Sequence, residues 1–245
     1  MKKSKIVYYF SILVYFLGIT LIYSQTNVYF LPGQGADERL FGKITLDSQF
    51  SKRYIAYPIP KKGENMANFA QSLVNQIDTT KPFVLIGTSL GGMLSVELAE
   101  IIKPKQVIII SSAKNNQELP FQYRFQRKIP LNRLVPKSMV KWSAQRLQPI
   151  VEPDRNKQKA IFKSMLSAKN KTYMKRSVDL ITHWNRTTYD AKIIHIHGDN
   201  DHTLPLKNIK ADHIIKGGSH MMTLTRGEEL NSLILSLLEK TSPKN

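Results

Sequence analysis

The segment from Gly87 to Gly92, GTSLGG, places a single serine between glycines. The apolar run FVLI precedes it, and MLSVELAEII, which has the character of a helix, follows it. A nucleophile on a sharp turn from strand to helix adopts a strained backbone, and its neighbours two residues away must be small so that strand and helix can approach. Gly87 and Gly91 hold those places, so the pattern predicts that Ser89 is a nucleophile. The alternative is a glycine-rich turn whose serine only caps the helix.

A turn of this kind also predicts where negative charge would be stabilised. The peptide N–H of Leu90 would point at the oxygen of a bound acyl group, at a helix N-terminus that favours developing negative charge.

A serine hydroxyl needs a base and an acid that orients the base. At such turns the partners follow in the order serine, carboxylate, histidine. Among six histidines, His220 has the best position, because it follows the last candidate strand in KGGSHMM, where Gly217 and Gly218 allow a tight loop. The segment HGDND follows the preceding strand and offers Asp199 and Asp201 as the acid. An exposed loop histidine and loop-capping aspartates are the alternatives.

A metal site is the alternative interpretation of the segment HIHGDNDH, which contains His195, His197, Asp199, Asp201 and His202. Imidazole and carboxylate groups suit zinc. The matching metal loop needs histidine directly after the first aspartate, however, and this chain has Asn200 there. DNDHTL also lacks the turn glycine and the distal glutamate of a calcium loop. We therefore expect no metal and no cofactor.

Length and composition limit the number of domains and the available chemistry. The chain has 245 residues with 42% apolar content, which suits one sizeable core and hence a single domain from residue 25 to 245. It contains no cysteine, which excludes disulfides, thiolate metal sites and a cysteine nucleophile. The net charge of +18 favours anionic partners in general.

The N-terminus has the layout of an export signal. Lys2, Lys3 and Lys5 precede an apolar run over residues 6–23. We expect residues 1–24 to be a signal peptide cleaved after Ser24, with an uncleaved membrane anchor as the alternative. Either way the rest of the chain would be exported, to the periplasm or the outside, or would face the periplasm from the anchor. A nucleic-acid partner is therefore not expected.

Short β-branched runs alternate with helical patterns from residue 27 onward. Six candidate strands occur, NVYFL, RYIAY, FVLI, VIIIS, KIIHI and HIIK. Helices are predicted over residues 63–78 and after residue 225, the latter opened by Thr225 and Glu228 in the spacing of a capping box. The alternation predicts an α/β fold whose sheet is mostly parallel, with helices on both faces.

Residues 113–190 interrupt this rhythm with helical patterns and no convincing strand, which predicts an inserted helical cap. The insertion holds 17 Lys and Arg against 5 Asp and Glu, or 12 of the 18 net charges. A solvated exterior and contact with anionic lipid or an anionic substrate both remain open interpretations. Within it we expect Phe121, Tyr123 and Phe125 to pack the cap onto the body, with a pocket lining as the alternative.

The chain from about residue 27 to 240 resembles the α/β-hydrolase family, in particular small serine esterases that carry a helical cap. The resemblance rests on GTSLGG, HGDND and GGSHMM occurring in order. It favours Asp201 over Asp199, because the family's acid usually stands three residues after the strand-ending glycine, here Gly198. It also assigns LPGQGAD to the loop where the backbone N–H of Gln34 completes an oxyanion site, although Pro32 departs from the family pattern. The chain also departs from the family at its start, because cleavage near Ser24 leaves no room for the two leading strands of the full family sheet, and we therefore expect about six strands.

These features together predict a serine hydrolase. It would cleave a carboxylic ester or thioester of a small acyl substrate through an acyl-enzyme intermediate, with Ser89, His220 and Asp201 as the triad. The alternative is a non-catalytic envelope protein that keeps the scaffold and binds anionic lipid or glycan, such as an anionic membrane surface, through its basic cap.

Overall fold

The structure is a computed structural model that describes residues 25–128, 135–146, 150 and 152–240. The expected signal peptide or anchor, residues 1–24, lies outside the described residues. Within the described ranges, no helix combines the length and the apolar character needed to cross a lipid bilayer.

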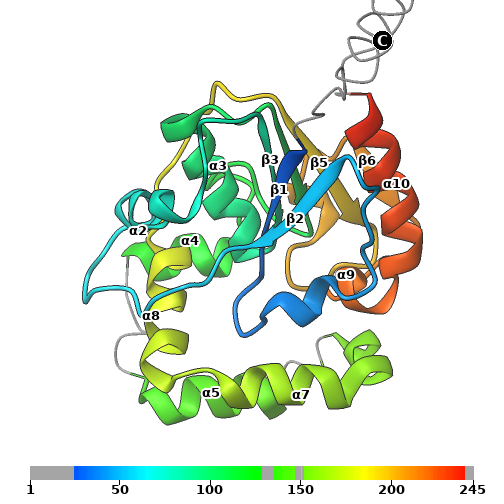
Figure 1. Cartoon of the computed structure of the whole chain (residues 1–245). Helices are drawn as coiled ribbons and strands as arrows, with labels where there is room; N and C mark the ends of the chain where they lie inside the picture. Colours follow the sequence, from blue (N-terminus) through cyan, green and yellow to red (C-terminus); the bar gives the residue numbers. More distant parts are fainter. Residues whose placement is uncertain (1–24, 129–134, 147–149, 151, 241–245) are drawn as a thin grey trace, which may run out of the picture.

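The described residues form one sheet of six strands (Figure 1). The strands are β1 (Thr26–Leu31), β2 (Phe50–Tyr54), β3 (Phe83–Thr88), β4 (Gln106–Ile110), β5 (Ile193–Gly198) and β6 (His213–Ile215). Their order in the sheet is β2-β1-β3-β4-β5-β6, and all five pairings are parallel. This confirms the predicted fold class. Parallel strands end at one edge, so the loops that follow β1, β3, β5 and β6 meet there.

The second strand begins three residues earlier than RYIAY predicts. It covers Phe50–Tyr54 and pairs with β1 from Phe50 opposite Thr26. Because β2 is an edge strand, only Phe50 is buried, and the strand carries Lys52 and Arg53. Charged side chains are common on edge strands, where they discourage pairing with other chains, and they hide the strand from a search for apolar runs.

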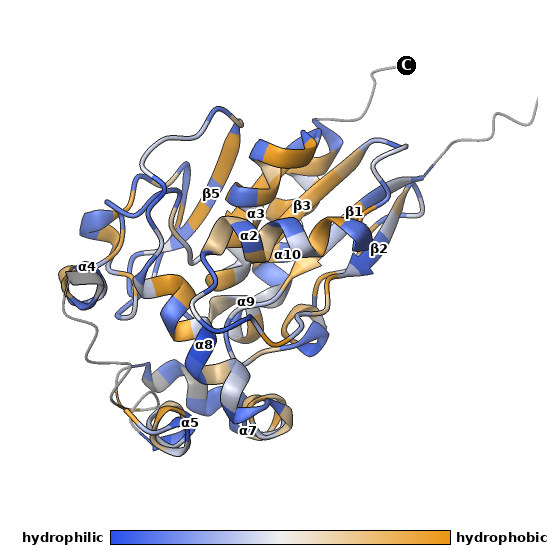
Figure 2. Ribbon diagram, turned by 90° about the vertical axis from the view of Figure 1, so that its left-hand side faces the viewer, coloured by the Kyte–Doolittle hydropathy of each residue, from blue (hydrophilic) through white to orange (hydrophobic). Residues whose placement is uncertain are grey.

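Helices cover both faces of the sheet (Figure 2). One face packs against α2 (Met66–Leu73), which continues into η2 (Val74–Gln76), and against α3 (Leu90–Ile102). The other face packs against η1 (Glu38–Phe41), α9 (Met222–Thr225) and α10 (Gly227–Glu239). A further short turn, η5 (Leu206–Asn208), follows the acid loop. The strands are thus buried on both sides, as their continuous apolar runs require.

The predicted capping box of the last helix is wrong. Helix α10 begins at Gly227, and Arg226 in the N-cap position makes no side-chain cap. Thr225 belongs to α9, and its hydroxyl donates to Asp154 of the inserted segment. The hydroxyl therefore joins two segments that are distant in sequence.

The interval between β4 and β5 is helical in its described residues. It contains α4 (Phe121–Lys128), α5 (Lys137–Arg146), η4 (Pro153–Gln158), α7 (Lys159–Ala168) and α8 (Lys171–Thr182). Helix α5 packs against α8 and α7, and this group lies across the edge of the sheet where the strands end (Figure 1). We call these helices the cap.

The expectation that all three cap aromatics pack onto the body is wrong. Phe121 and Phe125 are 68% and 40% exposed. The segment is a helix, so positions 121 and 125 lie on one face, with ring centroids 5.8 Å apart. That face is turned away from the body of the protein. Tyr123 packs against the buried core, as expected, and also lines a cavity, which was the alternative interpretation.

Candidate active site

Ser89 lies on the turn between β3 and α3 and has a backbone φ of 53°. A positive φ is uncommon for a residue with a side chain. It is held by hydrogen bonds from Ser89 N to the Ile110 carbonyl (3.0 Å) and from Ser112 Oγ to the Ser89 carbonyl (2.7 Å). A Cβ added at Gly91 would overlap the carbonyl of Leu31, so the turn requires glycine there.

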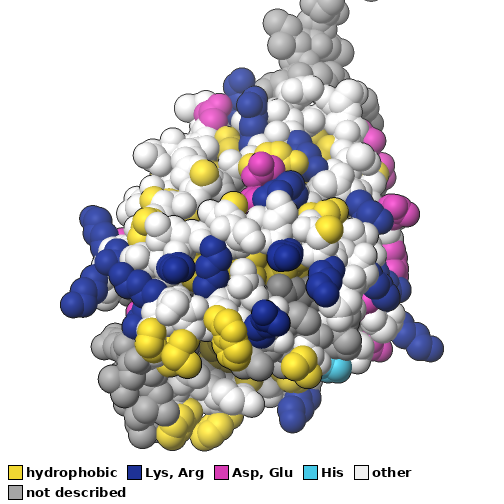
Figure 3. Space-filling model, turned by 90° about the horizontal axis from the view of Figure 1, so that it is seen from below, with side chains coloured by type: hydrophobic (Ala, Val, Ile, Leu, Met, Phe, Trp, Pro, Cys, Tyr) yellow, Lys and Arg dark blue, Asp and Glu magenta, His cyan; other side chains and the backbone are white. Residues whose placement is uncertain are grey.

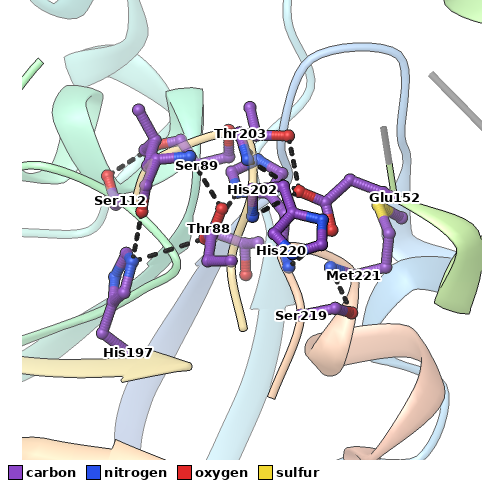
Figure 4. A network of polar contacts seen from close by, with 12 residues as sticks. Thr88, Ser89, Ser112, Glu152, His197, His202, Thr203, Ser219, His220 and Met221 are labelled. Carbon is purple, nitrogen blue, oxygen red and sulfur yellow. Dashed lines mark hydrogen bonds and ion pairs between the residues drawn. The ribbon is translucent and has the colours of Figure 1, made fainter. Parts of the chain in front are cut away.

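The structure brings Ser89, His220 and Asp201 together. His220 Nε2 is 3.0 Å from Ser89 Oγ, and His220 Nδ1 is 2.8 Å from Asp201 Oδ2. Because a carboxylate only accepts, Nδ1 carries the proton and Nε2 is left to accept from the serine hydroxyl. Figure 4 shows the side chains of Ser89 and His220 converging from separate loops. This is the arrangement in which an imidazole can remove a hydroxyl proton.

The charges around His220 favour its protonated form. Burial lowers the pKa of His220, but the charge and hydrogen bond of Asp201, together with the charge of Glu152, outweigh burial and raise that pKa above its ordinary value. Burial raises the pKa of Asp201, and the interactions with His220 and His197 and the Leu204 N–H outweigh it, so that this pKa is lowered. Asp201 is therefore an anion beside an imidazole that it can stabilise when protonated.

Asp199, the other candidate acid, lies in a different place. Its Oδ1 accepts from the backbone N–H of Gly217 (2.5 Å), which ties the loop after β5 to the loop after β6. Gly217 has a φ of 68°, so the turn that receives this bond suits glycine. Asp199 therefore shapes the histidine loop and does not touch the imidazole ring.

A pair of buried histidines stands behind Asp201. His197 Nε2 lies 2.8 Å from the Leu204 carbonyl, so this nitrogen carries a proton, and it is also 3.4 Å from Asp201 Oδ2. His197 Nδ1 must then accept from His195 Nε2, 3.0 Å away, which leaves His195 Nδ1 buried without a partner. Desolvation lowers the pKa of both rings, in agreement with two neutral imidazoles.

The two residues whose backbone N–H groups were predicted to stabilise an oxyanion both lie beside Ser89. Leu90 is the first residue of α3, where N–H groups have no partner within the helix. Gln34 follows Gly33, and a Cβ added at Gly33 would lie 3.3 Å from Ser89 Cβ. The Gln34 side chain donates to the Met174 carbonyl (3.0 Å) and to Ser177 Oγ (2.8 Å) of α8, so the cap fixes this loop.

Sequence reasoning missed Glu152, which lies in the cap and is fully buried. Its Oε1 accepts from the backbone N–H groups of His202 (2.8 Å) and Thr203 (2.7 Å) and from the Thr203 hydroxyl (2.9 Å). Its Oε2 accepts from the backbone N–H of His220 (3.4 Å). Figure 4 shows Glu152 beside the acid loop and the histidine loop, which it joins.

Asp154 adds a second contact of the same kind. Its Oδ2 accepts from Ser219 Oγ (2.9 Å), directly before His220, and from Thr225 Oγ1 (2.8 Å). Two cap carboxylates therefore hold the loop that carries the imidazole. The weak signal in the sequence was that both acids interrupt a strongly basic segment.

Two joined cavities lead to Ser89. The inner one, of about 90 Å³, has polar groups around Ser89 and His220 and an apolar part that includes Leu40, Met93, Phe162, Leu166, Met174 and Ile181. The outer one, of about 500 Å³, lies under α4, α5 and α8 and shares Gln34 and Tyr123 with the inner one. Among the described residues, neither lining contains Lys, Arg, Asp or Glu.

The described residues contain no group of three or more His, Cys, Asp or Glu side chains arranged to hold a metal ion. The crowded segment from His195 to His202 is divided instead, with His195 and His197 within β5, Asp201 at His220 and His202 near the surface beside Asn200.

Comparisons with known proteins identify the fold of this chain. A family model described as "Alpha/beta hydrolase family" matches residues 28–233. Solved structures with a similar fold include MenH from S. aureus (17% identity, TM-score 0.63, covering 88% of this chain and 94% of that one). An esterase from Exiguobacterium antarcticum (16%, 0.61, 88% and 92%) and a thermophilic esterase from Thermogutta terrifontis (13%, 0.61, 89% and 91%) are also similar. A search of curated proteins found no match.

Proposed function

Because the chain belongs to the alpha/beta hydrolase family, we propose that it is a serine hydrolase that cleaves carboxylic esters through an acyl-enzyme intermediate. The observation that carries this proposal is the continuous path from Ser89 Oγ through both nitrogens of His220 to Asp201, at 3.0 and 2.8 Å. Two of the solved structures named above are esterases, which supports the reaction class without identifying a substrate.

The reaction would proceed in two halves. Ser89 Oγ attacks the acyl carbonyl carbon while its proton passes to His220 Nε2, and the negative charge on the carbonyl oxygen is stabilised by the N–H groups of Leu90 and Gln34. The tetrahedral centre collapses, the bond to the alcohol oxygen breaks, and Nε2 returns the proton to that oxygen. Water then attacks the acyl-enzyme by the same route and releases the acid and the serine.

The cavities favour an uncharged acyl group of modest size. The inner cavity of about 90 Å³ would hold only a short acyl chain, which could pack against Leu40, Phe162 and Leu166. The larger outer cavity, with Gln122, Gln126 and Ser143 in its lining, would take the alcohol part. We therefore expect short-chain neutral esters to be better substrates than thioesters or amides of long acids.

Labelling by a fluorophosphonate probe tests the nucleophile. We expect the wild-type protein to be labelled at Ser89 and the Ser89→Ala variant not to be labelled. Ser112→Ala is a matched control, since Ser112 supports the turn and lies off the proton path. A folded wild-type protein that never labels would favour the alternative, a non-catalytic envelope protein.

A second experiment tests the acid. Asp201→Asn should lower kcat by about 10⁴-fold, as loss of the orienting carboxylate does in related triads, while Asp199→Asn should leave most of the activity. The measurement is the hydrolysis of p-nitrophenyl esters of increasing chain length. Loss of turnover in Asp199→Asn alone would show that the acid is misassigned.

A further inference from the structure

We propose that the outward face of the cap docks on an anionic lipid bilayer. The surface in question, which we call the cap floor, is formed by the exposed sides of α5 and α7. It comprises the apolar residues Met139, Trp142 and Ile161 and the basic residues Arg146, Lys159 and Lys163. The proposal concerns where the hydrolase meets its substrate, so it rests on the proposed function for its meaning, although docking itself can be measured without turnover.

The first observation is exposure of large apolar side chains. Met139 and Trp142 on α5 are each 52% exposed, and Ile161 on α7 is 40% exposed. The helices α5 and α7 pack against each other, so these side chains belong to one side of the molecule. Apolar groups gathered on a surface with charged neighbours mark an interaction site more often than isolated ones do.

The second observation is the sign of the surrounding charge. The segments that form α5 and α7, KSMVKWSAQR and KAIFKSMLSA, contain five Lys and Arg and no Asp or Glu. Figure 3 shows hydrophobic and basic side chains side by side over this side of the molecule, with Asp and Glu mainly toward the upper part and the right edge of the view. Trp and aliphatic groups framed by Lys and Arg are typical of surfaces that lie in the headgroup region of anionic bilayers.

The same charge argues against a second copy as the occupant. A symmetric dimer through the cap floor would bring two identical sets of cations together, and their repulsion would oppose association. An anionic lipid surface instead neutralises the cations and buries the apolar groups.

The inward faces of these helices connect the cap floor to the candidate site. Val140, Ser143 and Ala144 of α5 line the outer cavity, and Phe162 and Leu166 of α7 line the inner one. Docking would thus place the entrance to Ser89 next to the bilayer, where esters that dissolve in lipid are concentrated. Thr26, the first residue of β1, lies at the opposite edge of the sheet. If the segment before Thr26 were held in a membrane, the cap floor would face away from that membrane.

The experiment uses the fluorescence of the full chain with vesicles. The chain has two tryptophans, and Trp184 is buried and donates to Glu97, so an emission shift reports Trp142. We expect phosphatidylglycerol vesicles to move the emission to shorter wavelength, phosphatidylcholine vesicles to have little effect, and added salt to reverse the shift. The Ser89→Ala variant should respond like the wild type, which separates docking from catalysis.

A matched pair of variants identifies the surface. Combining Arg146→Gln, Lys159→Gln and Lys163→Gln should weaken vesicle binding by about fivefold per residue, or about 100-fold in total. The control combines Lys81→Gln, Lys103→Gln and Lys105→Gln, which remove the same number of positive charges from exposed positions at the opposite edge of the sheet. The apolar run at residues 6–23 is common to all forms, so differences between them report the cap floor.

Three outcomes would overturn the proposal. One is the absence of a Trp142 shift with anionic vesicles at low salt. Another is equal loss of binding in the control and cap-floor variants. The third is a shift that follows protein concentration without vesicles, together with a change of mass in sedimentation equilibrium, which would assign the surface to a second copy of the chain.

Discussion

At the scale of single residues, His220 lies between two carboxylates with different geometry. Asp201 binds the ring at Nδ1, whereas Glu152 binds the backbone N–H of the same residue. Both raise the pKa of the imidazole against the effect of burial. Catalysis by a general base requires the neutral ring, so a raised pKa moves the onset of activity to higher pH.

This gives a prediction for the pH profile. In the wild type, kcat/KM should fall as the pH drops through the pKa of His220, at a pH above that of an ordinary histidine. Glu152→Gln removes one negative charge, so the pKa of His220 should decrease and the acid limb should move to lower pH. The measurement is kcat/KM for a p-nitrophenyl ester between about pH 5 and 9, where an ordinary histidine would titrate near 6.5.

Glu118→Gln provides the control for that profile. Glu118 is also a buried carboxylate that accepts from backbone N–H groups, of Lys114 and Lys210, but it lies away from the imidazole. It should cost stability without moving the acid limb. An unchanged limb in Glu152→Gln would mean that Glu152 acts only as a structural link.

The Gln34 side chain leads to a second prediction. Gln34→Ala keeps the backbone N–H that the mechanism uses but removes two hydrogen bonds to α8. We expect kcat to fall about tenfold, less than the 10²- to 10³-fold loss that follows removal of an oxyanion donor, because the loop is less well positioned. Ser177→Ala removes one of the two acceptors and should give a smaller loss in the same steady-state assay. A larger loss in Ser177→Ala would argue against positioning through Gln34.

Some of these residues could be predicted from the sequence, and others could not. Ser89, Asp201 and His220 each follow a strand in a recognisable order, and the common edge of a parallel sheet brings such positions together. Glu152 is 50 residues from His202 and 68 from His220 in sequence, and nothing in its own neighbourhood indicates that it is buried. The side chain of Gln34 was unpredictable for the same reason, because its two partners lie on a helix 140 and 143 residues away.

At the scale of elements, the contact between β1 and α3 is too close for any side chain at Gly91. Gly91→Ala should therefore destabilise the fold by about 3 kcal/mol, because an added methyl group in a closely packed region forces the backbone apart. It should also reduce activity, since Ser89 would move. Urea unfolding and the ester assay measure the two effects.

Gly42→Ala is a matched glycine substitution for this comparison. Gly42 has a φ of −60°, and the nearest atom to an added Cβ is the Arg39 carbonyl oxygen at 3.3 Å. We expect a change within about 0.5 kcal/mol, as for an ordinary surface position. Equal effects at the two positions would show that the contact at Gly91 can relax.

The positions of helices and strands could be predicted from the sequence where every residue of the element is buried. The central strands β3 and β4 are buried on both faces and agree with the apolar runs FVLI and VIIIS within two residues at each end. The edge strand and the start of α10 were misplaced, because the charged pattern of β2 and the contact between Thr225 and Asp154 depend on tertiary neighbours.

At the scale of the whole molecule, the net charge of +18 favours anionic substrates, whereas the cavities, which have no Lys or Arg in their lining, favour neutral ones. An anionic ester would be attracted to the surface, but a carboxylate in the inner cavity would lose its hydration without a Lys or Arg partner. We expect an ester with a carboxylate at the end of its acyl chain to have kcat/KM at least tenfold below that of the neutral ester of equal length. Parallel assays at low and high salt test this, and a preference for the anionic ester that persists in high salt would contradict it.

The cap is joined to the catalytic loops by Glu152, Asp154 and the bonds between Gln34 and α8. Specificity in this scaffold therefore cannot be transplanted by exchanging the cap as a module. A chimera would need to bring carboxylates to the same two backbone turns and an acceptor to Gln34. Otherwise the grafted enzyme would acquire a new binding chamber and lose the alignment of its proton path.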